Sequence, residues 1–134
     1  MWHSVPMTPE PNTSASAFDD KLGLEITELT AQRVRGRAPV NGNTQPIGLW
    51  HGGASATMVE TLGSLGANAH AGNDRKAVGT ELNVSHLRSA REGWVHGVAT
   101  AVHLGGTSAV YQIELTDDEG RHLATGRVSC RILD

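Results

Sequence analysis

Three polar side chains stand in the chain at a spacing that suggests catalysis. His51 follows Gln45 by six residues, Glu60 follows His51 by nine, and the pair Gly52 and Gly53 comes directly after the histidine. Glycines at the start of a helix leave backbone N–H groups unobstructed at its positive end, where they can bind an oxyanion. The glycines could instead serve only to permit a tight turn into the helix. The polar Gln45 and His51 beside these donors favour a site for a reacting carbonyl group.

Glu60 falls on an unusual side of the predicted helix. At 100° per residue, the apolar residues form one stripe that consists of Met58, Leu62 and Leu65. Glu60 projects on the opposite side, with Ser64 one turn later. The other residues there are Ala and Gly, which let a second helix or a ligand approach closely. A carboxylate in such a place is partly desolvated and its pKa is liable to shift. The alternative is an ordinary solvated glutamate.

The distance between the helix start and Glu60 constrains any mechanism that uses both. The nine residues from His51 to Glu60 span about 13 Å of helix at 1.5 Å per residue. The Glu60 carboxylate therefore cannot reach a carbonyl group held at the Gly52 N–H of its own chain. A catalytic role for both groups predicts an obligate homodimer in which each active site takes its glutamate from the partner subunit.

One helix and six strands must position these groups. Period-two alternation predicts two strands between residues 22 and 40, and an Asn-, Gly- and Pro-rich loop follows. The predicted helix runs from about residue 53 to residue 71 and precedes four strands, at residues 77–87, 94–104, 108–116 and 121–133. The order β-β-α-β-β-β-β with short hairpin turns predicts an α+β domain with a largely antiparallel sheet. A lone helix covers such a sheet only if the sheet curls around it, which leaves the outer face or an edge for self-association.

Composition sets the class of protein. The chain has 134 residues, a formal net charge of −3 and a single cysteine, Cys130. This length suits one domain, which we place at residues 18–134 behind a flexible leader at residues 1–17. The negative charge argues against nucleic-acid binding, and no apolar run is long enough to span a membrane. A lone cysteine and the lack of a signal peptide favour a cytoplasmic location.

A second polar cluster lies at the end of the strand predicted for residues 77–87. Its members are His86, Arg88, Ser89 and Arg91. Arginine and serine side chains at a strand end suit contacts with phosphate groups. A surface strand with routine charges would explain them equally well. The histidines show no spacing typical of metal ligands, and the sequence contains neither a phosphate-binding loop, a dinucleotide fingerprint nor a Gly-x-Ser-x-Gly elbow.

Two segments resemble a known family. They read QPIGLWHGGASATMVETLGSLGANA and VGTELNVSHLRSAREGWVHGVATAVHLGGTSAVYQIELTDDEG, and they are similar to the hotdog-fold acyl-CoA thioesterases. The closest branch is the PaaI-like one, with 4-hydroxybenzoyl-CoA and 1,4-dihydroxy-2-naphthoyl-CoA thioesterases. The similarity covers residues 20–133. It implies the hotdog fold, a curled antiparallel sheet wrapped around one long central helix, and a homodimer that commonly pairs again into a homotetramer.

The resemblance also implies roles for individual residues. It makes Glu60 the nucleophile or general base and Ser64 its hydroxyl neighbour one turn along the helix. Gly52 would donate the oxyanion N–H group, with help from His51 and Gln45. The residues expected to contact the substrate or its CoA portion are Gly53, Leu65, His86, Arg88, Ser89 and Arg91.

The expected activity is hydrolysis of an acyl-CoA thioester to free acid and CoA, with an aromatic or otherwise bulky acyl group. Trp50 stands where relatives often carry Leu and is expected to narrow the acyl pocket. No cofactor or metal is needed, because CoA is part of the substrate. The partners are then an acyl-CoA or acyl-carrier-protein thioester and a second copy of the chain. Alternatives are a hotdog hydratase or dehydratase, a non-catalytic acyl-CoA or carrier-protein binding module, and a structural oligomer. The acyl group and the pathway stay open.

Overall fold

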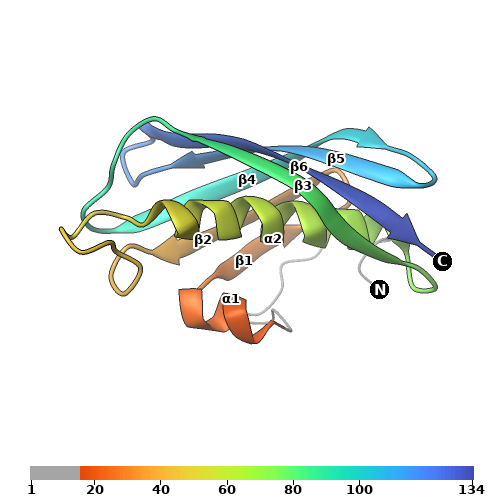
Figure 1. Ribbon diagram of the computed structural model, residues 1–134, viewed down its shortest axis with the longest axis horizontal. Coiled ribbons are helices and arrows are strands. Elements are labelled where there is room, and N and C mark those ends of the chain that lie inside the picture. Colours follow the sequence, from red (N-terminus) through yellow and green to blue (C-terminus); the bar gives the residue numbers. More distant parts are fainter. Residues whose placement is uncertain (1–15) are drawn as a thin grey trace.

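The computed structural model describes residues 16–134 as one curled antiparallel sheet around a long helix (Figure 1). The six strands lie in the order β1-β2-β4-β5-β6-β3. The elements are α1 (Ala17–Leu22), β1 (Glu25–Leu29), β2 (Arg33–Pro39), α2 (Gly52–Ala71), β3 (Lys76–His86), β4 (Trp94–Leu104), β5 (Ser108–Thr116) and β6 (His122–Leu133). The predicted architecture is therefore confirmed, and no strand end differs from its predicted position by more than three residues.

Helix α2 lies in the hollow of the sheet and contacts all six strands. Met58, Val59 and Leu62 of the helix are fully buried and pack with Tyr111 and Leu115 of β5. The sheet bends around them with shifts of register in several of its strand pairs, including a break in the β3–β6 pairing. Such irregularities bend a strand and increase its twist, which lets a single sheet wrap one helix.

The glycines of α2 allow the helix to lie close against its own sheet. A Cβ atom at Gly66 would lie 2.7 Å from the Tyr111 ring, and one at Gly63 would collide with the Val128 side chain. Ala67 is also fully buried. The expectation that the small residues on the Glu60 side of the helix admit a second helix or a ligand is therefore wrong for Gly63, because the Val128 side chain of β6 already occupies the space.

Short helix α1 was not predicted from the sequence, which placed its first residue in the flexible leader. The Ser16 hydroxyl accepts a hydrogen bond from the Asp19 N–H, and Gly23 ends the helix with φ of 78°. The Thr61 hydroxyl of α2 donates to the buried Asp19 carboxylate at 2.8 Å. Residues 1–15 of the predicted leader lie outside the described residues.

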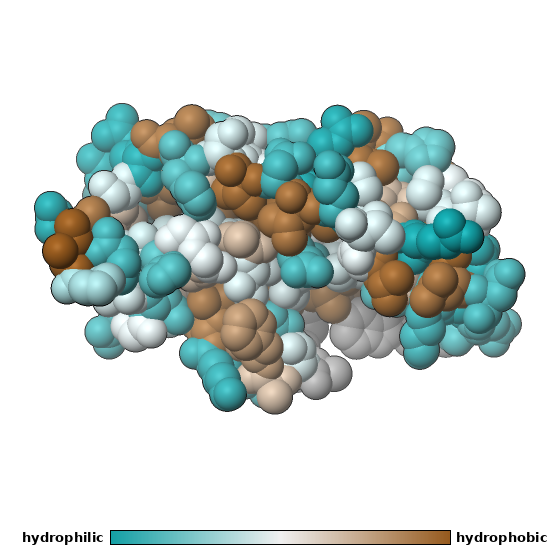
Figure 2. Space-filling model, in the orientation of Figure 1, coloured by the Kyte–Doolittle hydropathy of each residue, from teal (hydrophilic) through white to brown (hydrophobic). Residues whose placement is uncertain are grey.

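The two edges of the sheet differ in length and cover. Edge strand β1 has five residues, and its Glu25 and Glu28 form ion pairs with arginines of β2. Edge strand β3 has eleven residues, of which only Ala77 is buried. Figure 2 shows apolar patches between polar side chains on the face that β3 crosses. No helix within residues 16–134 is long and apolar enough to cross a membrane.

Candidate active site

The loop before α2 fixes the side chain of Gln45. The backbone closes on itself through hydrogen bonds from the Gln45 N–H to the Leu49 carbonyl at 2.8 Å and from the Gly48 N–H back to Gln45 at 3.0 Å. The Gln45 side-chain oxygen accepts the Ile47 N–H at 2.8 Å. The side-chain NH₂ group is then left to donate toward a ligand.

His51 is the N-cap of α2. Its backbone is extended, with φ of −77° and ψ of 131°, and its Nδ1 atom accepts the Gly53 N–H at 2.8 Å. A side chain that accepts one of the free N–H groups of the first turn stabilises the helix start. The Gly53 N–H is therefore used inside the protein. The Gly52 N–H donates to no other described residue and is the one left for a ligand.

Gly52 is a glycine because the His86 side chain lies against it. A Cβ atom at position 52 would lie 3.1 Å from both Cε1 and Nε2 of His86, which comes from the end of β3. The missing side chain thus lets the imidazole of His86 approach the first turn of the helix. Two parts of the chain that are 34 residues apart in the sequence meet at this point.

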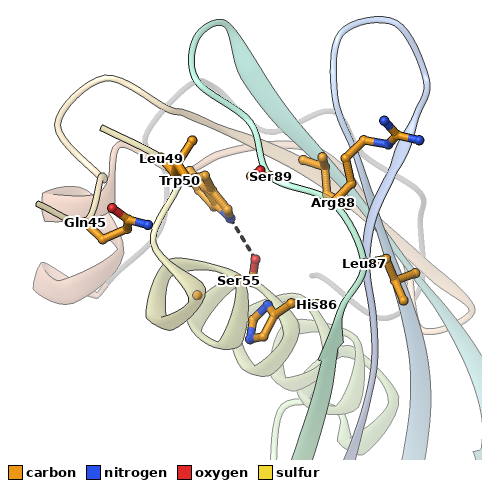
Figure 3. A pocket seen from close by; sticks show the side chains of 10 residues that line it. Gln45, Leu49, Trp50, Ser55, His86, Leu87, Arg88 and Ser89 are labelled. Carbon is orange, nitrogen blue, oxygen red and sulfur yellow. Dashed lines mark hydrogen bonds between the residues drawn. The ribbon is translucent and has the colours of Figure 1, made fainter. Parts of the chain in front are cut away.

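A pocket of about 450 Å³ opens between the helix start and the end of β3 (Figure 3). Its lining combines polar side chains with an apolar wall and consists of Gln45, Leu49, Trp50, Gly52, Ser55, His86, Leu87, Arg88, Ser89 and Leu123. We refer to these ten residues as the helix-start half-site. The sequence-predicted residues Gln45, Gly52, His86, Arg88 and Ser89 are brought together here.

Trp50 is anchored from both ends within the helix-start half-site. Its indole N–H donates to the Ser55 hydroxyl at 2.7 Å, shown as the dashed line in Figure 3, and its backbone N–H donates to the Ala90 carbonyl at 2.8 Å. Both side chains are buried. The first bond ties the loop before α2 to the helix, and the second ties the same loop to the loop after β3. Sequence reasoning missed Ser55, although a buried indole requires an acceptor.

Glu60 lines a different pocket. This second cavity, of about 280 Å³, lies where α2 passes β3 and is lined by Glu60, Gly79, Thr80, Glu81, Leu82 and Val128. We refer to these six residues as the Glu60 half-site. The two half-sites have no residue in common. This agrees with the prediction that Glu60 cannot act at the helix start of its own chain.

The Glu60 side chain is exposed and unbound in the single chain. It makes no hydrogen bond or ion pair with any residue from 16 to 134. Ser64, one turn further along α2, is near the buried Cys130 of β6: burial raises the pKa of the Cys130 thiol, while a hydrogen bond with Ser64 opposes the rise. The hydroxyl of Ser64 thus points toward β6 of the sheet.

The remaining predicted residues lie outside both half-sites. Arg91 lines a third cavity of about 340 Å³ between the β3–β4 and β5–β6 connections, which adjoins the helix-start half-site through Ser89. Leu65 is partly buried against the core. His51 and Gly53 hold the helix start without lining its pocket. Within the described part of the chain, no three His, Cys, Asp or Glu side chains converge on a point where they could hold a metal ion.

Comparisons with known proteins agree with this geometry. The family model of the thioesterase superfamily matches residues 47–124. The 1,4-dihydroxy-2-naphthoyl-CoA hydrolase of Escherichia coli is 45% identical over 84% of this chain and 83% of its own length. The proofreading thioesterase EntH of Cronobacter turicensis is 38% identical over 90% and 89% of the two chains.

Solved structures extend the likeness to the whole domain. A mutant thioesterase from Pseudomonas aeruginosa superimposes with a TM-score of 0.85 at 31% identity, covering 95% of this chain and 96% of that one. A thioesterase from Haemophilus influenzae gives the same TM-score at 30% identity, covering 90% and 85%. The sequence match to the family model and the structural match to solved thioesterases thus point to the same family as the sheet order and the enclosed helix. The chain is therefore a hotdog-fold enzyme that belongs to the thioesterase superfamily.

Proposed function

We propose that this enzyme hydrolyses acyl-CoA thioesters with aromatic or otherwise bulky acyl groups, in active sites shared between the two subunits of a homodimer. One observation carries the proposal. The free Gly52 N–H opens into the helix-start half-site, whereas the free carboxylate of Glu60 lies in a separate cavity beside an exposed edge strand. A second copy of the chain that pairs along β3 would complete each half-site with the other.

The helix-start half-site suits the thioester carbonyl. Its oxygen can accept the Gly52 N–H at the positive end of α2, with the Gln45 NH₂ group as a second donor. Both donors are fixed before substrate arrives, so they stabilise the negative charge that develops in the transition state without reorganisation. Removing one such donor typically costs about 10²–10³ in rate.

Glu60 of the partner subunit supplies the attack on the carbonyl carbon, by one of two routes. As a general base, it takes a proton from water while the water oxygen bonds to the carbon. As a nucleophile, it forms a mixed anhydride, which water then cleaves. In either route the C–S bond breaks, CoA leaves as a thiolate and takes up a proton, and the acid is released. Label in the Glu60 carboxylate after a single turnover in H₂¹⁸O would establish the anhydride route, because water that cleaves the anhydride at the Glu60 carbon leaves its oxygen there.

The CoA portion fits the polar side of the helix-start half-site. Arg88 and Ser89 line this pocket and Arg91 lines the adjoining cavity, so arginines are available to the phosphates of CoA. Leu49 and the buried Trp50 provide an apolar wall for a bulky acyl group. The relative named as a 1,4-dihydroxy-2-naphthoyl-CoA hydrolase supports an aromatic acyl-CoA thioester as the first substrate class to test.

Thiol release from a panel of acyl-CoA thioesters tests the activity. The panel contains benzoyl, hydroxybenzoyl, dihydroxynaphthoyl, phenylacetyl and medium-chain thioesters. We expect turnover by the wild type and a loss of about a thousand-fold or more in Glu60→Ala. CoA binding without thiol release from any member would favour a binding module or another hotdog reaction, and unimpaired thiol release by Glu60→Ala would show that Glu60 is not the reacting carboxylate.

Mixed subunits test the shared site. Glu60→Ala keeps an intact helix-start half-site, and Gln45→Ala keeps an intact Glu60 half-site. If sites are shared, co-refolding equal amounts of the two inactive variants restores about a quarter of wild-type activity, because half of the dimers are mixed and each contains one intact site. Sites confined to one subunit give no recovery. Light scattering on the same samples reports whether dimers pair further into tetramers.

A further inference from the structure

Gly79 on edge strand β3 faces the Glu60 carboxylate. A Cβ atom at this position would lie 3.0 Å from Oε2 of Glu60 and 3.8 Å from its Cγ and Cδ atoms. These three atoms of Glu60 are the nearest neighbours that such a Cβ would have. The space left by the missing side chain is therefore used by one group only, the carboxylate that the proposed reaction depends on.

The φ angle gives no reason for a glycine here, because Gly79 is not among the glycines with positive φ. Its partner Cys130 lies on β6, and the pairing shifts register between Gly79 and Glu81. A glycine within a strand weakens it relative to a β-branched residue, because it has no side chain to pack and loses more backbone entropy on folding. The glycine at position 79 is thus expected to make β3 less stable at the point where it passes Glu60.

An exposed glutamate needs such support. Its side chain has three rotatable bonds, and fixing a side chain of this type costs up to about 1.5–2 kcal/mol in conformational entropy. Glu60 has no hydrogen bond to another described residue that would fix it. Its carboxylate instead lies in the space that a side chain at position 79 would take, and both residues line the Glu60 half-site.

We propose that Gly79 is a positioning residue that seats the Glu60 carboxylate for attack. The inference rests on the proposed function, in which Glu60 is the reacting carboxylate. Filling the seat pushes the carboxylate away from the partner's helix-start half-site while leaving the fold, the oxyanion donor and the CoA contacts in place. Reaction rates depend steeply on such placement, since a displacement of about 1 Å can cost about 10²-fold.

Two substitutions fill the seat to different extents. We expect Gly79→Ala to lower kcat by about 10-fold and Gly79→Val by about 100-fold, with KM changed less than about two-fold. Val favours strands, so the Val variant should be no less stable to urea than the wild type. Lower kcat without lower stability separates positioning from structural damage. The matched control is Gly106→Ala, because a Cβ at Gly106 meets nothing within 4 Å; its kcat should not change.

A double-mutant cycle with Glu60→Asp identifies the group on which Gly79 acts. The aspartate carboxylate is one methylene shorter and ends short of Gly79. Gly79→Val should therefore lower kcat by less than about two-fold when it is added to Glu60→Asp. An equal loss in both backgrounds would overturn the inference and assign Gly79 to β3 itself or to the subunit contact, which light scattering on the variants would show directly.

Crystal structures decide the inference independently of activity. If the wild type released no thiol from any thioester, the proposed function would fail, but the seat would still be tested by the position of the Glu60 carboxylate in wild type and Gly79→Val. A displacement of about 1 Å or more supports the seat. An unmoved carboxylate, or an active wild type with unimpaired Gly79→Val, overturns it.

Discussion

The two half-sites differ in how far a single chain completes them. The helix-start half-site is held by internal hydrogen bonds: His51 caps the helix, Trp50 binds Ser55, and Gln45 binds its own loop. In the Glu60 half-site the central carboxylate is exposed, and the support that we infer for it within residues 16–134 is the room above Gly79.

This difference matches the two tasks. A donor to an oxyanion is effective only if it is rigid when charge develops, so its supports are built into the chain. In the proposed dimer, the carboxylate meets a substrate held by the other subunit, so the contact between the subunits can complete its site. Each of the following predictions tests how one of the two half-sites, or the structure around it, is held in place.

Removal of the Gly52 N–H should have the largest effect on the helix-start half-site. Gly52 is the first residue of α2, where proline is tolerated, and the extended backbone of His51 suits the residue before a proline. Gly52→Pro should therefore lower kcat about 10²–10³-fold further than Gly52→Ala. The Ala variant is the control, because both variants place a Cβ against His86. Equal kcat in the two would exclude the N–H as the oxyanion donor.

Loss of the Trp50 indole N–H should reduce stability. Trp50→Phe leaves the buried Ser55 hydroxyl without its donor, at a cost of about 1–3 kcal/mol in the free energy of unfolding. Urea denaturation measures the change. Adding Ser55→Ala should cost less in the Trp50→Phe background than in the wild type, because the hydroxyl is already unpaired there. Additive costs would show that the two side chains do not depend on each other.

The N-cap should contribute a smaller amount. His51→Ala removes the acceptor of the Gly53 N–H and should lower the free energy of unfolding by about 1 kcal/mol. His51→Asn keeps an acceptor at the cap and should restore most of that stability. If kcat stays low in His51→Asn while stability returns, the imidazole also acts on the substrate; recovery of both limits His51 to capping.

The turn behind the helix-start half-site should give the protein a modest acid sensitivity. Burial raises the pKa of the Asp117 carboxyl, but hydrogen bonds from Arg121 and the charge of its guanidinium outweigh this and hold the pKa below its usual range. The unfolded-state pKa is about 3.9, so this stabilisation is complete above that pH and is lost as the pH falls through the lower folded-state value. Urea midpoints from pH 6 to pH 2.5 should decline less in Asp117→Asn; a parallel decline would contradict the assignment.

Glu60→Gln should have the smallest effect on stability. The carboxylate is exposed and bonds to no other described residue, so the free energy of unfolding should change by less than about 0.5 kcal/mol. Urea denaturation of the Glu60→Gln variant and of the wild type measures this change, and the same preparations are assayed for loss of thioesterase activity. A larger loss of stability would mean that Glu60 supports the fold and that the two half-sites are more alike than the structure indicates.

Sequence patterns predicted the sheet and α2 because alternation and helical spacing are local signals. Helix α1 escaped them, since six residues are too few to display a helical period. The buried Asp19 that fixes it depends on Thr61, 42 residues away. Gly63 of α2 was assigned the wrong neighbour for a related reason: it meets Val128 of β6 only after the sheet has curled.

The candidate site was predictable where backbone geometry decides it. The glycine pair after His51 indicated an N–H group left open at the helix start, and helix length separated Glu60 from it. The supports of these groups were only partly predictable. The indole of Trp50 meets Ser55 five residues later in the chain, which is a local contact, whereas Gly79 and Glu60 approach each other across two elements. Local spacing thus identifies the chemical groups, whereas tertiary packing determines what holds them.

The order of the strands has a consequence for synthesis of the protein. Strand β3 pairs with β6 alone, so residues 76–86 have no strand partner until residues 122–133 have left the ribosome. During that interval both sides of β3 present unpaired N–H and C=O groups, which is the state in which strands associate with other chains. The same strand that is left open for a second subunit is thus the last to be secured, and a chain that stops before β6 leaves it open on both sides.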